Sequence, residues 1–172
     1  DPRVDATVEL CAMLIRAALK AGANKILPDD FVVGFANEAR QKHPTNLDVA
    51  IAVADLYLAT GLMDQANAVL DVTITLAPNE DYYHLFLGRA YLEAVSSAQS
   101  ESEAQNNLES ARDILLRAQK LNPLNTDHTA NLARLYRRWA ELTANDPAKR
   151  ADLAETSDRY YATALTLSPN SS

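Results

Sequence analysis

Side chains that commonly carry chemistry are few in this sequence and lie far apart. The three histidines, His43, His84 and His128, lack the paired spacing of metal ligands. No glycine-rich phosphate loop or nucleophile elbow is present, and the aspartates and glutamates are spread along helix faces. We therefore expect no catalysis, no cofactor and no metal. His84 is predicted to pack at a seam between helices, and His128 to lie at the surface or beside a helix cap.

The single cysteine, Cys11, excludes an internal disulfide. It shares helical spacing with Val4, Val8 and Ile15, which predicts a buried structural thiol.

The net charge of −7 argues against nucleic-acid binding, because that function requires a basic surface. The composition, 48% hydrophobic and 23% charged, is typical of a globular protein. No apolar stretch is long enough to cross a bilayer, so we expect no membrane contact by this segment.

The stretch 47–80 is predicted to form two amphipathic helices around a turn. Apolar residues recur at helical spacing on both sides of Thr60 and Gly61, which break the first helix. Asp64 is placed to cap the second helix, and Pro78 ends it. Pro44 precedes Pro78 by 34 residues, which sets the length of this unit.

This 34-residue period resembles that of the tetratricopeptide repeat family. The family's Leu-Gly and following Tyr positions recur three times in phase, as Val53, Ala54 and Tyr57, as Leu87, Gly88 and Tyr91, and as Leu132, Ala133 and Tyr136. Its later pattern of small and large residues recurs as Ala66, Leu70 and Thr73, as Ala111, Leu115 and Ala118, and as Ser157, Tyr161 and Ala164. Small residues let two helices approach closely, while larger ones fill the space between hairpins.

The resemblance implies an all-α fold, a right-handed superhelix of antiparallel hairpins with about eight helices. We expect one domain, 1–172, with a degenerate N-terminal hairpin at 1–46, a standard unit at 47–80 and elongated units at 81–125 and 126–172. In the degenerate hairpin, one helix is predicted from Val4 to about Ala21, and Asp29 or Asp30 is expected to cap the next.

The two elongated units carry 11 or 12 extra residues at the tips of their hairpins. Ser100 and Glu103 have the spacing of a capping box, while Asn145 or Asp146 can cap a helix with Pro147 in its first turn. We therefore predict that each of the four helices gains about one and a half turns. The two long hairpins are expected to pack side by side. The alternative is a mobile loop over the serine-rich stretch 96–102.

The first helices of the repeats are predicted to line a groove that binds a protein or peptide partner, as the family resemblance implies. The candidate groove residues are Asp55, Tyr82, Leu85, Arg89, Asn131, Arg134, Arg137 and Arg138. The groove becomes basic toward its arginines, which favours an acidic group. The alternative is that these charges pair with each other, as Asp55 and Arg89 are placed to do. Trp139, Tyr160 and Tyr161 are interpreted as packing residues.

The stretches NPLNTDHTANLARLYRRWAEL and DRYYATALTLSPNS resemble segments of bacterial O-antigen ligase or polymerase-type membrane proteins. That resemblance implies an alternative function, an accessory extracytoplasmic domain whose parent protein is anchored in the membrane. Localisation is therefore open: cytoplasmic for a stand-alone scaffold, extracytoplasmic for a domain of such a membrane enzyme. No further helix covers Tyr161, Leu165 or Leu167, so this face is expected to meet more of the parent protein or a second copy of the chain.

Overall fold

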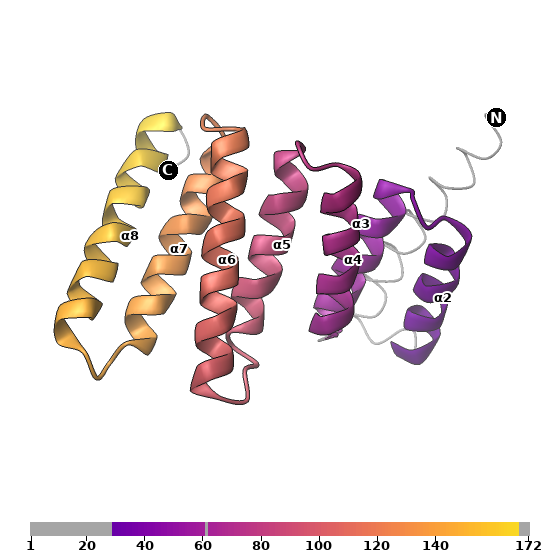
Figure 1. The fold of residues 1–172 in the computed structure, drawn as a ribbon, viewed down its shortest axis with the longest axis horizontal. Coiled ribbons are helices and arrows are strands. Elements are labelled where there is room, and N and C mark those ends of the chain that lie inside the picture. The colour runs from indigo at the N-terminus through magenta and orange to yellow at the C-terminus, as the bar shows by residue number, and fades with distance from the viewer. Residues whose placement is uncertain (1–28, 61, 169–172) are drawn as a thin grey trace. The chain divides into compact units, whose positions relative to one another are not determined.

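The structure, a computed structural model, describes residues 29–60 and 62–168. The chain divides into two compact units, Asp1–Pro78 (unit 1) and Asn79–Ser172 (unit 2). The described residues form seven α-helices and no strand, in agreement with the predicted all-α helical-repeat fold (Figure 1). The helix expected from Val4 to Ala21 and the environment of Cys11 lie outside the described residues.

Unit 1 contains α2 (Asp29–Lys42), α3 (Leu47–Ala59) and α4 (Met63–Leu76). Asn46 caps α3 by accepting a hydrogen bond from the backbone N–H of Val49 at 3.0 Å. Helix α3 packs against both α2 and α4. The Tyr57 hydroxyl of α3 donates to Asn37 Oδ1 of α2 at 2.6 Å, so a polar contact joins these helices beside their apolar one.

The expected cap at Asp64 is wrong. Helix α4 already begins at Met63, its N-cap residue is Leu62, and no side chain caps it. Asp64 lies in the first turn, where its carboxylate favours the helix through the positive end of the helix dipole rather than as a cap.

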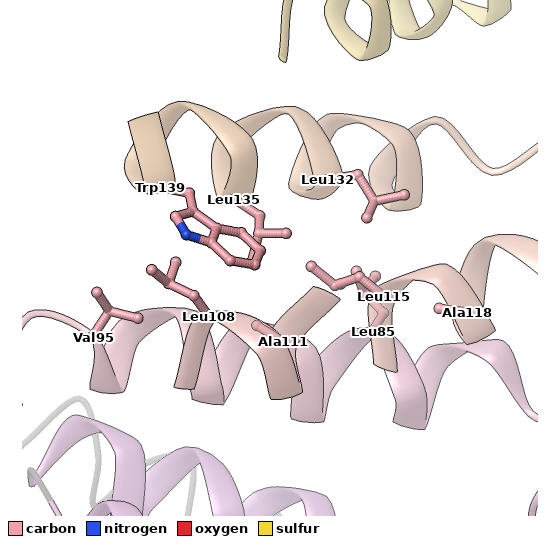
Figure 2. Packing of buried hydrophobic residues seen from close by; sticks show 9 residues of the cluster. All are labelled: Leu85, Val95, Leu108, Ala111, Leu115, Ala118, Leu132, Leu135 and Trp139. Atoms are coloured by element: carbon pink, nitrogen blue, oxygen red, sulfur yellow. The ribbon is translucent and has the colours of Figure 1, made fainter. Parts of the chain in front are cut away.

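Unit 2 contains α5 (Asp81–Ala94), α6 (Glu101–Leu121), α7 (Thr126–Leu142) and α8 (Pro147–Leu167). Helices α5 and α6 form one hairpin, α7 and α8 form the next, and α6 packs against α7. Figure 2 shows Leu135 and Trp139 of α7 facing Leu108 and Ala111 of α6. The predicted side-by-side packing of the two long hairpins is therefore confirmed.

The close approach of α5 and α6 requires Gly88. A Cβ atom at this position would lie 2.6 Å from Cγ and 2.7 Å from Cδ2 of Leu115, a residue with no exposed surface. Carbon atoms in ordinary contact lie about 3.5–4.0 Å apart. The small residue predicted here therefore allows the hairpin to close.

The predicted equal lengthening of four helices is only partly correct. Helices α6 and α8 have 21 residues each and α7 has 17, but α5 has 14, close to the 13 of α3. The extra residues after α5 form a turn, residues 95–100, because Ser100 already caps α6. Its side chain accepts from the N–H of Glu103 at 3.1 Å, and the Glu103 carboxylate accepts from the N–H of Gln99 at 2.7 Å. Asp146, rather than Asn145, caps α8.

Candidate functional site

A buried polar contact aligns the first helices of the two hairpins in unit 2. His128 of α7 has no exposed surface, and its Nε2 lies 2.6 Å from Oδ2 of Asp81, the first residue of α5. The Asn125 side chain, which caps α7, also donates to Asp81 Oδ2 at 3.4 Å. This contact brings the N-terminal ends of α5 and α7 to the same level, and the reversal of the chain in each of the hairpin turns makes the two helices run in the same direction.

The hydrogen bonds to Asp81 change its ionisation. Burial would raise the pKa of this carboxyl, but hydrogen bonds from His128, Asn122 and Asn125 outweigh burial and lower the pKa below its ordinary value. Since a carboxylate can only accept, Nε2 of His128 carries the proton in this contact, and Nδ1 has no partner among the described residues.

The sequence predicts that His128 lies at the surface or beside a helix cap. The surface position is wrong, because the side chain is fully buried. The side chain lies beside the α7 cap as predicted, but it is enclosed by packing because Asp81 reaches it from another helix. A local pattern could not show this, since Asp81 and His128 are 47 residues apart. Buried His84, which is 7% exposed, agrees with its predicted packing role.

The register of α5 and α7 places two of the predicted arginines at the same height. Arg89 and Arg134 each follow the first residue of their helix by eight positions, a rise of about 12 Å. Both side chains are exposed, and neither forms an ion pair with another described residue of unit 2. Arg137 continues the exposed stripe one turn beyond Arg134. We call Arg89, Arg134 and Arg137 the arginine face.

Two of the predicted groove arginines have an internal partner. Arg137 Nε lies 4.0 Å from Oε1 of Glu141, and the Arg138 guanidinium donates to Oε2 of the same carboxylate at 3.4 Å. The side chains of Arg137 and Glu141 are 59% and 53% exposed. Exposed pairs of this kind contribute about 0–1 kcal/mol, so Glu141 leaves both arginines able to exchange it for another carboxylate.

The other candidate groove residues differ in accessibility. Tyr82 is 50% exposed and its ring lies near those of Tyr83 and Phe86, with centroids 5.9 and 5.4 Å away. Leu85 is 6% exposed and belongs to the core cluster of unit 2. Asn131 is 7% exposed, and its amide donates to the Asp127 carbonyl of its own helix at 2.7 Å. These two side chains therefore serve mainly to pack unit 2.

Asp55 is the candidate that lies in unit 1, where it is half-buried on α3. Its pairing with Arg89 stays a prediction.

The sequence model of the tetratricopeptide repeat family matches residues 35–94. The fold also resembles that of solved structures of this kind. A thermophilic TPR protein of Thermus thermophilus, TTC0263, has 17% identity and a TM-score of 0.57, over 91% of each chain. MamA has 17% identity and a TM-score of 0.61, over 87% of this chain and 73% of that one. MamA of Desulfovibrio magneticus has 15% identity and a TM-score of 0.62, over 95% and 77% of the two chains.

Residues 35–94 therefore match the tetratricopeptide repeat, and the described helices have the fold of tetratricopeptide-repeat proteins. No curated protein matches the chain in sequence. Since the solved structures are under 25% identical, they establish the fold and not a partner. Proteins built from tetratricopeptide repeats generally act as protein-interaction scaffolds.

In this tetratricopeptide fold, the aromatic residues of unit 2 form a stack that the sequence pattern did not predict as a group. The Tyr136 ring lies nearly parallel to those of Trp139 and Tyr160, with centroids 6.3 and 5.6 Å away. The Arg112 guanidinium lies 5.7 Å from the centroid of the Trp139 ring. The packing roles predicted for Trp139 and Tyr160 agree with this arrangement, whereas Tyr161 is 41% exposed. The helical spacing of Tyr136 and Trp139 was the available signal.

A metal site and a membrane-spanning helix each place a requirement on the described residues. Among these residues, no group of three or more His, Cys, Asp or Glu side chains could hold a metal ion. None of the described helices is both long and apolar enough to span a bilayer.

Proposed function

We propose that the chain is a non-catalytic interaction scaffold that binds an acidic protein or peptide segment through the arginine face. The observation that carries this proposal is the level placement of Arg89 and Arg134 on two parallel helices, where both are exposed and neither forms an ion pair with another described residue of unit 2. A guanidinium presents a planar fork of N–H donors that matches a carboxylate. Two such forks on neighbouring helices suit a ligand with several carboxylates.

The charge of the whole chain makes this face selective. The chain has a net charge of −7, so an acidic ligand is repelled by most of its surface and attracted only where arginines gather. Exposed Tyr82 lies on α5, the helix that carries Arg89, and adds an apolar surface with a polar tip. We therefore expect the ligand to combine carboxylates with apolar side chains.

The test uses two labelled ten-residue peptides, one alternating glutamate with leucine and one alternating glutamine with leucine. Fluorescence anisotropy should report tighter binding of the glutamate peptide, with a preference that weakens as salt is raised. Changing Arg89, Arg134 and Arg137 together to Ala should remove the preference. Equal binding of both peptides by the unchanged chain would contradict the proposal.

A matched control removes the same charge elsewhere. Arg117, Lys120 and Arg150 are exposed residues of α6 and α8 outside the arginine face. Their joint change to Ala lowers the net charge equally, but it should leave most of the glutamate preference intact. If both triple variants lose the preference equally, overall charge and not this face determines binding.

The alternative function, an accessory domain of an O-antigen ligase or polymerase-type enzyme, rests on the sequence resemblance and stays a prediction. Its test is the reading frame upstream of Asp1. Several hydrophobic spans there would favour this alternative, and their absence would remove it.

A further inference from the structure

A pocket of about 560 Å³ lies at the tips of the two long hairpins of unit 2. Its walls come from the turn at residues 95–100, the start of α6, the end of α7 and the start of α8. Sites for small ligands commonly have volumes of about 300–1,000 Å³. The hairpin of α3 and α4 has only residues 60–62 as its turn, so the tip pocket is built where the longer hairpins add residues.

Trp139 lines this pocket and carries an unused hydrogen-bond donor. The side chain is 6% exposed, and its indole Nε1 is buried without a hydrogen-bond partner in the described part of the chain. Figure 2 shows the nitrogen on the ring edge that faces Leu108, which also lines the pocket. An indole N–H can only donate, so a ligand that pairs with it must supply an acceptor. The stack of Tyr136 and Arg112 on the ring holds this donor in place.

The remaining walls indicate a ligand without net charge. Arg138 and Lys149 contribute two positive charges, and Glu101 and Asp146 contribute two negative charges. One carboxylate oxygen of Asp146 already accepts a hydrogen bond from the backbone N–H of Lys149 at 3.0 Å. A strongly anionic or cationic ligand would therefore meet repulsion as well as attraction.

The apolar walls complete the recognition pattern. Val95, Leu108 and Leu142 line the pocket together with the Trp139 ring, while Asn145 offers an amide that can donate or accept. A peptide backbone carries both donors and acceptors and no charge, and its side chains can be apolar. We propose that the tip pocket binds an apolar side chain of a peptide together with a neighbouring backbone carbonyl, which accepts from the Trp139 indole N–H.

This proposal is independent of the arginine face. The tip pocket is proposed to bind an uncharged peptide segment, whereas the arginine face is proposed to bind carboxylates, and the two sites are made of different residues of unit 2. The variant with Arg89, Arg134 and Arg137 changed to Ala should therefore retain binding at the tip pocket.

The test exploits the fact that Trp139 is the only tryptophan of the chain. The ¹⁵N-labelled protein should give one indole N–H cross-peak, which can be followed while N-acetyl-leucine N-methylamide is added. We expect a saturable downfield shift of this peak, together with shifts at Gln105 and Lys149, which line the pocket. The glycine analogue of the probe lacks the apolar side chain and should bind at least several-fold more weakly. No saturable shift with the leucine probe, or equal binding of both probes, would overturn the proposal.

Two variants test the hydrogen bond itself. Trp139→Phe keeps an aromatic ring but removes the donor, and binding, read from the Gln105 and Lys149 amides, should weaken about three- to tenfold. Tyr160→Phe is the matched control, because it removes a polar atom from the same aromatic stack but does not line the tip pocket. Unchanged affinity in Trp139→Phe, or equal weakening in both variants, would show that the indole does not donate to the ligand.

Discussion

Changing Gly88 to Ala tests whether the hairpin of α5 and α6 depends on a missing side chain. The new Cβ would lie 2.6 Å from Leu115 Cγ, roughly 1 Å inside ordinary contact. Cγ is the branch point of a side chain with no exposed surface, so the contact cannot be relieved by moving a flexible end. Overpacking of this kind costs about 1–3 kcal/mol. Ala favours a helix over Gly by about 1 kcal/mol, so we expect a net loss of about 1 kcal/mol.

A sharper test compares the effect of Gly88→Ala on the free energy of unfolding in the original chain and in a Leu115→Ala variant, where the effect should have opposite signs. Leu115→Ala should cost about 2–5 kcal/mol, because it leaves a cavity in the core. In that variant the new methyl group at position 88 meets no branch point, and only the helix preference of Ala remains. Gly88→Ala should therefore destabilise the original chain but stabilise the Leu115→Ala variant by about 1 kcal/mol.

Urea unfolding followed by Trp139 fluorescence measures these free energies. Trp139 belongs to the same core cluster as Leu115, so its emission reports the unfolding of unit 2. Gly34→Ala in α2 is the control, because a Cβ there meets no atom within 4 Å. Far-UV circular dichroism should show that this change stabilises the chain by up to about 1 kcal/mol. If Gly88→Ala stabilises both backgrounds, the close approach of α5 to α6 is not what requires glycine.

Two further predictions concern the polar contact and the C-terminal face. Because the pKa of Asp81 is lowered in the folded state, the stability it contributes is present above its ordinary pKa of about 3.9 and is lost as pH falls through the lower folded value. Asp81→Asn should therefore be less stable than the original chain at about pH 6. Urea unfolding should show that this difference in the free energy of unfolding shrinks below about pH 4. A difference that stays constant with pH would contradict a stabilising role of the ionised Asp81 carboxylate. Leu165 is 62% exposed on α8, so Leu165→Glu should reduce self-association in light scattering, whereas Ala162→Glu should not. A strictly monomeric original chain at high concentration would refute that role.

Local patterns in the sequence were sufficient to predict the helices and most of their ends. Ser100 and Asp146, both candidate caps in the sequence, each accept a hydrogen bond from a backbone N–H in the first turn of the following helix, an interaction that depends only on residues three positions apart. Pro44 separates α2 from α3 for an equally local reason, because it has no N–H to donate. Three hairpins with small residues at matching positions then indicate a repeat fold.

The lengths of the helices at the hairpin tips could not be predicted as well. The sequence shows how many residues each tip gains, but not how they divide between turn and helix. The Glu103 carboxylate accepts from the N–H of Gln99 and holds the turn before α6, so α5 ends at Ala94. The energetic difference between one more helical turn and a loop depends on such contacts.

The sequence by itself determined the elements, the small residues between them and the position of the arginines along their helices. Those properties follow from spacing and local hydrogen bonding. Only the tertiary structure decided that His128 is buried against Asp81 and that Leu85 and Asn131 are largely inaccessible. It also decided that Trp139 lines a pocket while its indole N–H is buried without a partner among the described residues. These properties depend on which side chain a neighbouring helix brings close, and contacts between residues tens of positions apart do not leave a periodic signal in one sequence.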